Sequence, residues 1–117
     1  MRIVFGGPRQ THLEDVDPPE AGPGQLVARA LVSLISTGTE CIALSAAFEP
    51  DTSWANWVRF PFYPGYSMIG EVVSVGPGVH QIKPGQRVAA RKPHAEMFLA
   101  EEVEAATLNN AQNAPIR

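Results

Sequence analysis

Four hydroxyl side chains lie in two short segments of this chain, and hydroxyl groups can orient or protonate the oxygen of a substrate. Thr37 and Thr39 precede an expected helix, while Tyr66 and Ser67 directly follow Gly65. Threonine hydroxyls and the free amides of a helix start can both donate hydrogen bonds to a carbonyl oxygen. A tyrosine phenol can donate a similar bond or act as a general acid. We therefore take Tyr66, Thr39, Thr37 and Ser67 as candidate catalytic residues.

Each of these residues also has an ordinary structural explanation. Thr37-x-x-Glu40 fits a capping box, in which the threonine hydroxyl accepts a hydrogen bond from an amide of the first helical turn. Capping alone accounts for the threonines, and it is compatible with a binding role. Packing accounts equally well for Tyr66, and the sequence supplies no basic partner for Ser67.

One histidine and a loop rich in aromatic residues are the candidates for substrate binding. His94 opens an expected strand and could reach a cleft, although surface and packing roles are commoner for a lone histidine. The irregular stretch 48–63 carries large aromatic side chains that must pack on the core or on a ligand. They could line an apolar pocket or close the open side of a barrel. The candidate substrate-binding residues are Trp54, Trp57, Phe62 and His94.

Length, composition and charge describe one globular domain. The chain has 117 residues, of which 44% are hydrophobic and 18% are charged. The net charge is −3 without a basic run, so we expect no nucleic-acid partner. No apolar run approaches the roughly 18 residues that span a bilayer, and no signal-peptide pattern is seen, so we expect a cytoplasmic protein without membrane contact. The single cysteine, Cys41, excludes an internal disulfide, and we expect it to be buried.

Short apolar runs alternate with glycine- and proline-rich turns along the chain. The clearest strand covers residues 69–75 and ends at Gly76-Pro77-Gly78, and the expected helix covers about residues 40–47. Further strands are expected at residues 2–5, 13–17, 25–35, 86–91 and 95–99. Periodicity alone leaves a helix open for 25–35, whereas its glycine-proline entry favours a strand. The pattern is typical of an all-β barrel or sandwich.

Three segments, in order, resemble the medium-chain dehydrogenase/reductase superfamily. Residues 33–40 resemble its segment ending in Cys-Gly-Thr-Asp, residues 64–78 (PGYSMIGEVVSVGPG) its Gly-His-Glu strand, and residues 82–89 (IKPGQRVA) the strand that follows. The likeness covers residues 1–104 and leaves a polar tail, 105–117, that we expect to be loosely held. It implies an all-β GroES-like fold, a partly open β-barrel with one short α-helix, which forms the substrate-side domain of these enzymes.

The same resemblance implies a member without zinc. Thr37 stands where zinc members have their cysteine ligand, Tyr66 where they have histidine, and Ser67 where they have glutamate. Zinc prefers thiolate, imidazole or carboxylate ligands, so we expect no bound metal. Thr39 matches a hydroxyl that often serves a proton relay in the family, and Glu40 matches the aspartate.

Full-length members of the superfamily continue into a Rossmann domain that binds NAD(P). Gly22-x-Gly24 and Gly76-x-Gly78 both lack the third glycine of the dinucleotide fingerprint and carry proline between the glycines, as turns do. No βαβ unit follows either segment. We therefore expect no cofactor site in this chain, and NAD(P) only if a Rossmann domain is supplied elsewhere.

Three functions fit these features. The first is the substrate-side domain of a zinc-independent oxidoreductase that acts on a small carbonyl or enone compound, with a separate nucleotide-binding domain or a second copy of the chain as partner. The second is an autonomous, cofactor-free isomerase, dehydratase or cyclase acting on a small apolar carbonyl compound. The third is a non-catalytic binding or assembly module. The resemblance favours the first, whereas the polar tail favours independence.

Overall fold

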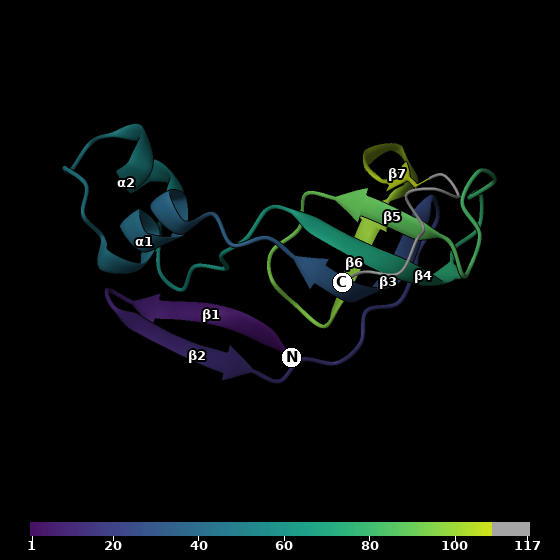
Figure 1. The fold of residues 1–117 in the computed structure, drawn as a ribbon, viewed down its shortest axis with the longest axis horizontal. Helices are drawn as coiled ribbons and strands as arrows, with labels where there is room; N and C mark the ends of the chain where they lie inside the picture. The colour runs from purple at the N-terminus through teal and green to yellow at the C-terminus, as the bar shows by residue number, and fades with distance from the viewer. Residues whose placement is uncertain (109–117) are drawn as a thin grey trace.

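The computed structural model describes residues 1–108, in which seven strands and two helices form two connected halves (Figure 1). The strands are β1 (Arg2–Gly7), β2 (Gln10–Glu14), β3 (Gln25–Ser33), β4 (Met68–Val75), β5 (Arg87–Ala90), β6 (Met97–Glu101) and β7 (Ala106–Thr107). The helices are α1 (Thr37–Ser45) and α2 (Ser53–Trp57), and a single 3₁₀ turn covers Glu102–Glu104. The predicted all-β class with one short α-helix is confirmed, because within the described part only α1, with nine residues, is longer than a five-residue helical turn such as α2.

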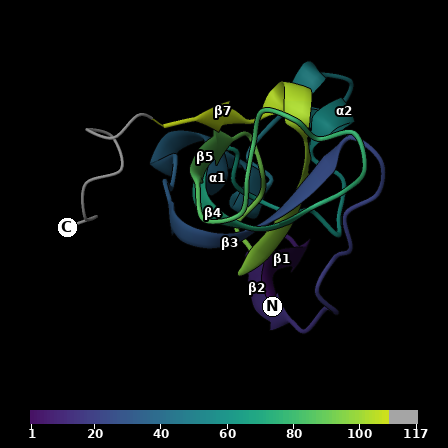
Figure 2. The same cartoon turned by 90° about the vertical axis from the view of Figure 1, so that its right-hand side faces the viewer.

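The sheet half consists of β3 to β7, paired antiparallel in the order β6-β3-β4-β5-β7. Strand β4 alternates buried Met68, Gly70 and Val72 with more exposed neighbours, as a strand with one face on a core does. The two edge strands do not pair with each other, so the curved sheet makes a partly open barrel (Figure 2). Its core contains Leu26, Ala28, Met68, Val72, Ile82, Val88, Ala90, Phe98 and Ala100.

The helical half consists of the β1–β2 hairpin, α1, α2 and the loop that leads to β4, and it lies at the other end of the molecule (Figure 1). Phe5 of β1 pairs with Phe62 through two backbone hydrogen bonds of 2.8 and 2.9 Å. A second core forms here around buried Phe5, Ala43 and Val58, against which Ile3, Leu44, Phe48, Trp54, Phe60 and Phe62 pack. The aromatic loop is therefore joined to the hairpin through Phe62.

The start of α1 differs from the sequence prediction. The helix begins at Thr37, about three residues earlier than predicted, and Ser36 is its N-cap without a side-chain capping bond. The predicted capping box at Thr37 is therefore wrong. Only the return half of such a box exists, in which a Glu40 oxygen accepts from the Ser36 amide at 2.6 Å. Because Glu40 and Ala43 form the buried face of α1, Cys41 points away from the core and is exposed, contrary to expectation.

Two other local differences come from turns. The hairpin closes at Pro8-Arg9, where Arg9 has a φ of 61°, so β2 begins at Gln10 and not at residue 13. Helix α2 was not predicted, although Thr52 caps it by accepting from the Ala55 amide at 3.3 Å. At the carboxyl end, Ala106–Thr107 pairs with β5, whereas residues 109–117 of the predicted tail lie outside the described residues. The domain boundary at residue 104 stays a prediction.

Candidate active site

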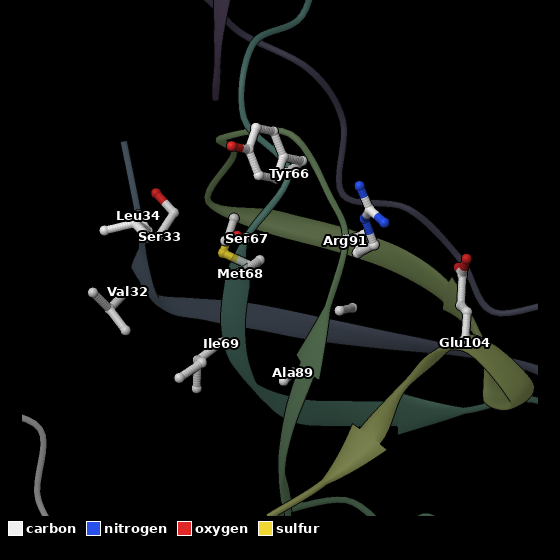
Figure 3. Close-up of a pocket in the computed structure, with 11 residues that line it drawn as sticks. Val32, Ser33, Leu34, Tyr66, Ser67, Met68, Ile69, Ala89, Arg91 and Glu104 are labelled. Atoms are coloured by element: carbon white, nitrogen blue, oxygen red, sulfur yellow. The ribbon is translucent and has the colours of Figure 1, made fainter. Parts of the chain in front are cut away.

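A cavity of about 490 Å³ opens where β3 ends, β4 begins and β5 ends. The antiparallel register produces this meeting point, because Ser33 faces Met68 across one strand pair and Met68 faces Ala90 across the next. The cavity, shown in Figure 3, is lined by Val32, Ser33, Leu34, Tyr66, Ser67, Met68, Ile69, Ala89, Ala90, Arg91 and Glu104. We call it the substrate cavity, after the role proposed for it below.

Tyr66 and Ser67, two of the predicted catalytic residues, both line the substrate cavity. Figure 3 shows Ser33, Tyr66 and Ser67 gathered at one end and Glu104 at the other, with Arg91 between Tyr66 and Glu104. The Arg91 guanidinium lies 5.9 Å from the centre of the Tyr66 ring. Most of the remaining wall is aliphatic. An apolar cavity with a few hydroxyl groups at one end suits a small organic molecule that carries an oxygen.

Glu104 places a carboxylate at the far rim of the cavity. Its oxygen lies 2.8 Å from Lys92 Nζ. The hydrogen bond from Lys92 holds the pKa of Glu104 below its usual value, and the amide of Glu101 acts in the same direction. The charges of Glu104 and Lys92 therefore compensate each other at the rim. Arg91, which also lines the cavity, is then the cation that can contact a bound molecule.

His94 lies buried in the loop before β6 and connects two polar side chains from distant elements. Its Nε2 is 2.6 Å from Glu40 Oε1, and its Nδ1 is 2.7 Å from Ser33 Oγ. The other oxygen of Glu40 accepts from the Ser36 amide. His94 itself is only 5% exposed. The structure thus aligns Ser33, His94 and Glu40 in one hydrogen-bonded row that begins at the substrate cavity.

Backbone contacts fix the position of His94. Its amide donates to the Pro64 carbonyl at 2.9 Å, and its carbonyl accepts from the Ile3 amide at 3.2 Å. Gly65 has a φ of +105°, and a Cβ at that position would lie 2.8 Å from the imidazole. Glycine is therefore required beside His94, immediately before Tyr66. The histidine lies at the junction between the sheet half and the helical half.

The remaining predicted catalytic residues lie apart from the substrate cavity. Thr37 borders a second, smaller cavity of about 230 Å³ together with Glu40 and His94. Thr39 lies in the first turn of α1 and lines neither of these two cavities. The structure therefore brings Tyr66 and Ser67 together and separates them from Thr37 and Thr39.

The predicted aromatic substrate-binding residues form a packed cluster. Trp57 meets Phe62 edge to face, with ring centroids 5.2 Å apart, and lies 5.7 Å from Trp54. Phe62 in turn contacts Phe5 of β1 at 6.2 Å. None of the three lines the substrate cavity. Phe62 therefore joins the aromatic cluster to the hairpin.

Sequence reasoning singled out His94 but gave Ser33 no role, and it assigned Glu40 to capping and to the position of the family's aspartate. The reason is separation along the chain: Ser33 and His94 are 61 positions apart, and Glu40 and His94 are 54 apart. Glu40 carried one usable signal, because an acidic residue on the apolar face of a helix needs a buried partner.

The donor chemistry of these residues does not fit a zinc ion. Among residues 1–108, no group of three or more histidine, cysteine, aspartate or glutamate side chains is arranged to hold a metal. Thr37 and Tyr66 line different cavities and offer hydroxyl groups, which are poor zinc ligands at neutral pH. The described elements also contain no βαβ unit that could cradle a dinucleotide. No helix in this part of the chain is long and apolar enough to cross a membrane.

Comparison with known sequences agrees with this architecture. The family model described as the alcohol dehydrogenase GroES-like domain matches residues 24–111. The chain is 34% identical over 86 residues to 2-desacetyl-2-hydroxyethyl bacteriochlorophyllide A dehydrogenase of Cereibacter sphaeroides, covering 74% of this chain and 26% of the relative. It is 30% identical over 97 residues to crotonyl-CoA reductase of Streptomyces avermitilis, covering 71% of this chain and 21% of the relative. The chain thus spans about a quarter of the length of these relatives or less.

Comparison with solved structures supports the GroES-like fold. The quinone oxidoreductase of Escherichia coli, solved in complex with NADPH, superposes with a TM-score of 0.66 at 21% identity. The superposition covers 94% of this chain and 33% of that chain. At this level of identity the likeness concerns the fold alone.

Proposed function

Because the chain belongs to the alcohol dehydrogenase GroES-like domain family of the medium-chain dehydrogenases/reductases, we propose that it is the substrate-side domain of an oxidoreductase that works without catalytic zinc on a carbonyl or enone compound. The substrate cavity carries this proposal. Its apolar wall would hold the carbon skeleton, and the hydroxyls at one end would bind the oxygen. The names of two relatives, a dehydrogenase and a crotonyl-CoA reductase, are compatible with such substrates.

We assign the substrate oxygen to Tyr66 and Ser67. Both line the cavity at the end where hydroxyl groups gather, and a phenol is a good hydrogen-bond donor to a carbonyl. The proposal assigns fewer residues than the four selected from sequence, because Thr37 lines the smaller cavity beside Glu40 and Thr39 lines neither cavity. Phe62 contacts Phe5 of the hairpin, and Trp54 and Trp57 contact one another and Phe62 in the same cluster, which favours packing over substrate binding.

NAD(P), held by a nucleotide-binding domain beyond the described residues, would supply the hydride when bound. Exposed apolar side chains beside the cavity support a covering domain. Leu34 and Ile35 are 68% and 62% exposed, and Leu31 and Val32 continue the same stretch. Val32 and Leu34 also line the cavity, and exposed apolar side chains at the mouth of a cavity are typical of an interface. A nucleotide-binding domain placed there would close the cavity and exclude water.

No observation among residues 1–108 favours a cofactor-free enzyme or a non-catalytic module over this assignment. The cytoplasmic location and a homodimer stay predictions.

The test is turnover by the full-length gene product, with NADH or NADPH and either cyclohexenone or benzaldehyde as probe. We expect nucleotide consumption that is insensitive to EDTA. We expect Tyr66→Phe to lower kcat by about 10²-fold, the loss typical of one positioned donor. Tyr63→Phe is the matched control, because that phenol lies near Arg2, outside the substrate cavity. Absence of turnover with both probes would contradict the proposed function, and EDTA inhibition reversed by zinc would contradict the zinc-free part alone.

A further inference from the structure

We propose that Ser33, His94 and Glu40 form a proton relay, in which Ser33 exchanges a proton with the substrate oxygen while His94 and Glu40 position and polarise the serine. The relay rests on the proposed function, because it presupposes an alcohol or carbonyl oxygen in the substrate cavity. It begins at a serine that lines the cavity and ends at a buried carboxylate.

The hydrogen-bond geometry fixes the direction of the relay. A carboxylate has only acceptors, and both oxygens of Glu40 are in use, one with the Ser36 amide and one with His94 Nε2. Nε2 must therefore carry the hydrogen of a neutral His94 ring. The lone pair on Nδ1 then faces Ser33 Oγ at 2.7 Å and accepts its hydroxyl proton.

The proton step balances without any further reactant. A substrate hydroxyl gives its proton to Ser33 Oγ while the proton of Ser33 moves to His94 Nδ1. One substrate O–H bond breaks, one N–H bond forms, and the imidazolium that results lies against the Glu40 carboxylate. In the direction of carbonyl reduction the same proton returns to the substrate oxygen.

Burial makes this arrangement effective. The side chains of His94 and Glu40 are 6% and 10% exposed. Hydrogen bonds and ion pairs in such surroundings are electrostatically stronger than in water. Ser33 is half-buried and lies at the wall of the cavity, so it is the member that can touch a ligand.

The same three residue types could suggest a nucleophilic serine, but the surrounding backbone argues against it. Acyl transfer needs free N–H groups aimed at the developing oxyanion. The amide that follows the serine, that of Leu34, already donates to the Ser67 carbonyl at 3.0 Å. Proton transfer needs no such donor, and therefore fits the site better.

The position of the proton on His94 tests the direction of the relay, and turnover separates the relay from a purely structural link between the two halves. Long-range ¹H–¹⁵N spectra of the histidine-labelled protein report which ring nitrogen of His94 carries the proton. We expect the Nε2–H form in the wild type, in Ser33→Ala and in the matched control Glu96→Gln, whose side chain is exposed. Glu40→Gln should shift the ring toward Nδ1–H, because an amide NH₂ can then face Nε2. A wild-type ring with its proton on Nδ1 overturns the relay, since that nitrogen could not accept from Ser33.

Turnover of the full-length product with benzaldehyde and its preferred nucleotide gives the second readout. Ser33→Ala should lower kcat by about 10²-fold or more with KM changed by only a few-fold, because general acid–base groups contribute about 10²–10⁴-fold. Ser33→Thr retains a hydroxyl and should restore most of the rate, and Glu96→Gln should match the wild type. Wild-type turnover with an unaffected Ser33→Ala variant overturns the relay alone. A wild type that turns over neither benzaldehyde nor cyclohexenone overturns the proposed function, and with it the relay for this reaction.

Discussion

Replacing Glu40 by alanine should destabilise the chain far more than its position near the start of a nine-residue helix suggests. The carboxylate accepts two hydrogen bonds of 2.6 Å, from the Ser36 amide and from His94 Nε2. Removing it leaves one buried donor at His94 and one partly buried donor at Ser36 without an acceptor, and a buried unsatisfied donor costs about 1–3 kcal/mol. We therefore expect a loss of about 1–4 kcal/mol in the free energy of unfolding. Because a typical domain is stable by about 5–15 kcal/mol, the variant should still fold.

The assay is equilibrium urea denaturation followed by circular dichroism and tryptophan fluorescence. Glu40→Gln keeps the shape and one acceptor, so it should lose less than Glu40→Ala. Glu96→Ala removes an exposed glutamate whose partner is the amino terminus, and should cost about 1 kcal/mol or less. A Glu40→Ala variant as stable as Glu96→Ala would refute the argument that the row at His94 stabilises the fold.

Three further predictions concern the surroundings of this row. Gly65→Ala should lower the free energy of unfolding by about 2–6 kcal/mol in urea denaturation, because its Cβ would meet the buried imidazole at 2.8 Å and its φ of +105° strains any other residue. Phe5→Ala should lower the free energy of unfolding by about 3–5 kcal/mol in the same assay, because Phe5 is buried. Trp57 is half-exposed, so Trp57→Ala should lower it much less. Equal losses would contradict the packing described for the aromatic cluster. The pKa of Glu104 is lowered, so its pairing with Lys92 stabilises the fold above the usual pKa of 4.5, and this contribution is lost as pH falls through the folded pKa. Lys92→Met should therefore flatten the dependence of thermal stability on pH in that range. The effect should be less than about 1 kcal/mol because Glu104 is 41% exposed, and a profile identical to that of the wild type would contradict the prediction.

Much of the fold follows from local patterns that act over a few residues. Glycine-proline turns delimit β3 and β4, and the alternation in β4 identifies its buried face. Such signals are readable because turn chemistry and side-chain alternation are properties of neighbouring residues. The errors occurred where a single backbone conformation decided the outcome, as at Arg9 in the hairpin and at the first residue of α1.

The candidate site was only partly readable. Tyr66 and Ser67 follow a glycine before the clearest strand, and the structure places both at a cavity. Their relation to Thr37 could not be derived, because the distance between two segments depends on how the intervening loop packs. That loop is held by the contact between Phe62 and Phe5, which joins residues 57 positions apart in the sequence.

The sequence by itself determined the all-β class and the family resemblance, because residue types and turn patterns are local properties. Only the tertiary structure decided which hydroxyls share a cavity and which partners His94 meets. Antiparallel register brought Ser33 beside Met68, and the packing of α1 turned Glu40 toward the imidazole. A buried polar side chain needs a partner, but the sequence does not specify which one, since the partner is chosen by contacts between distant segments.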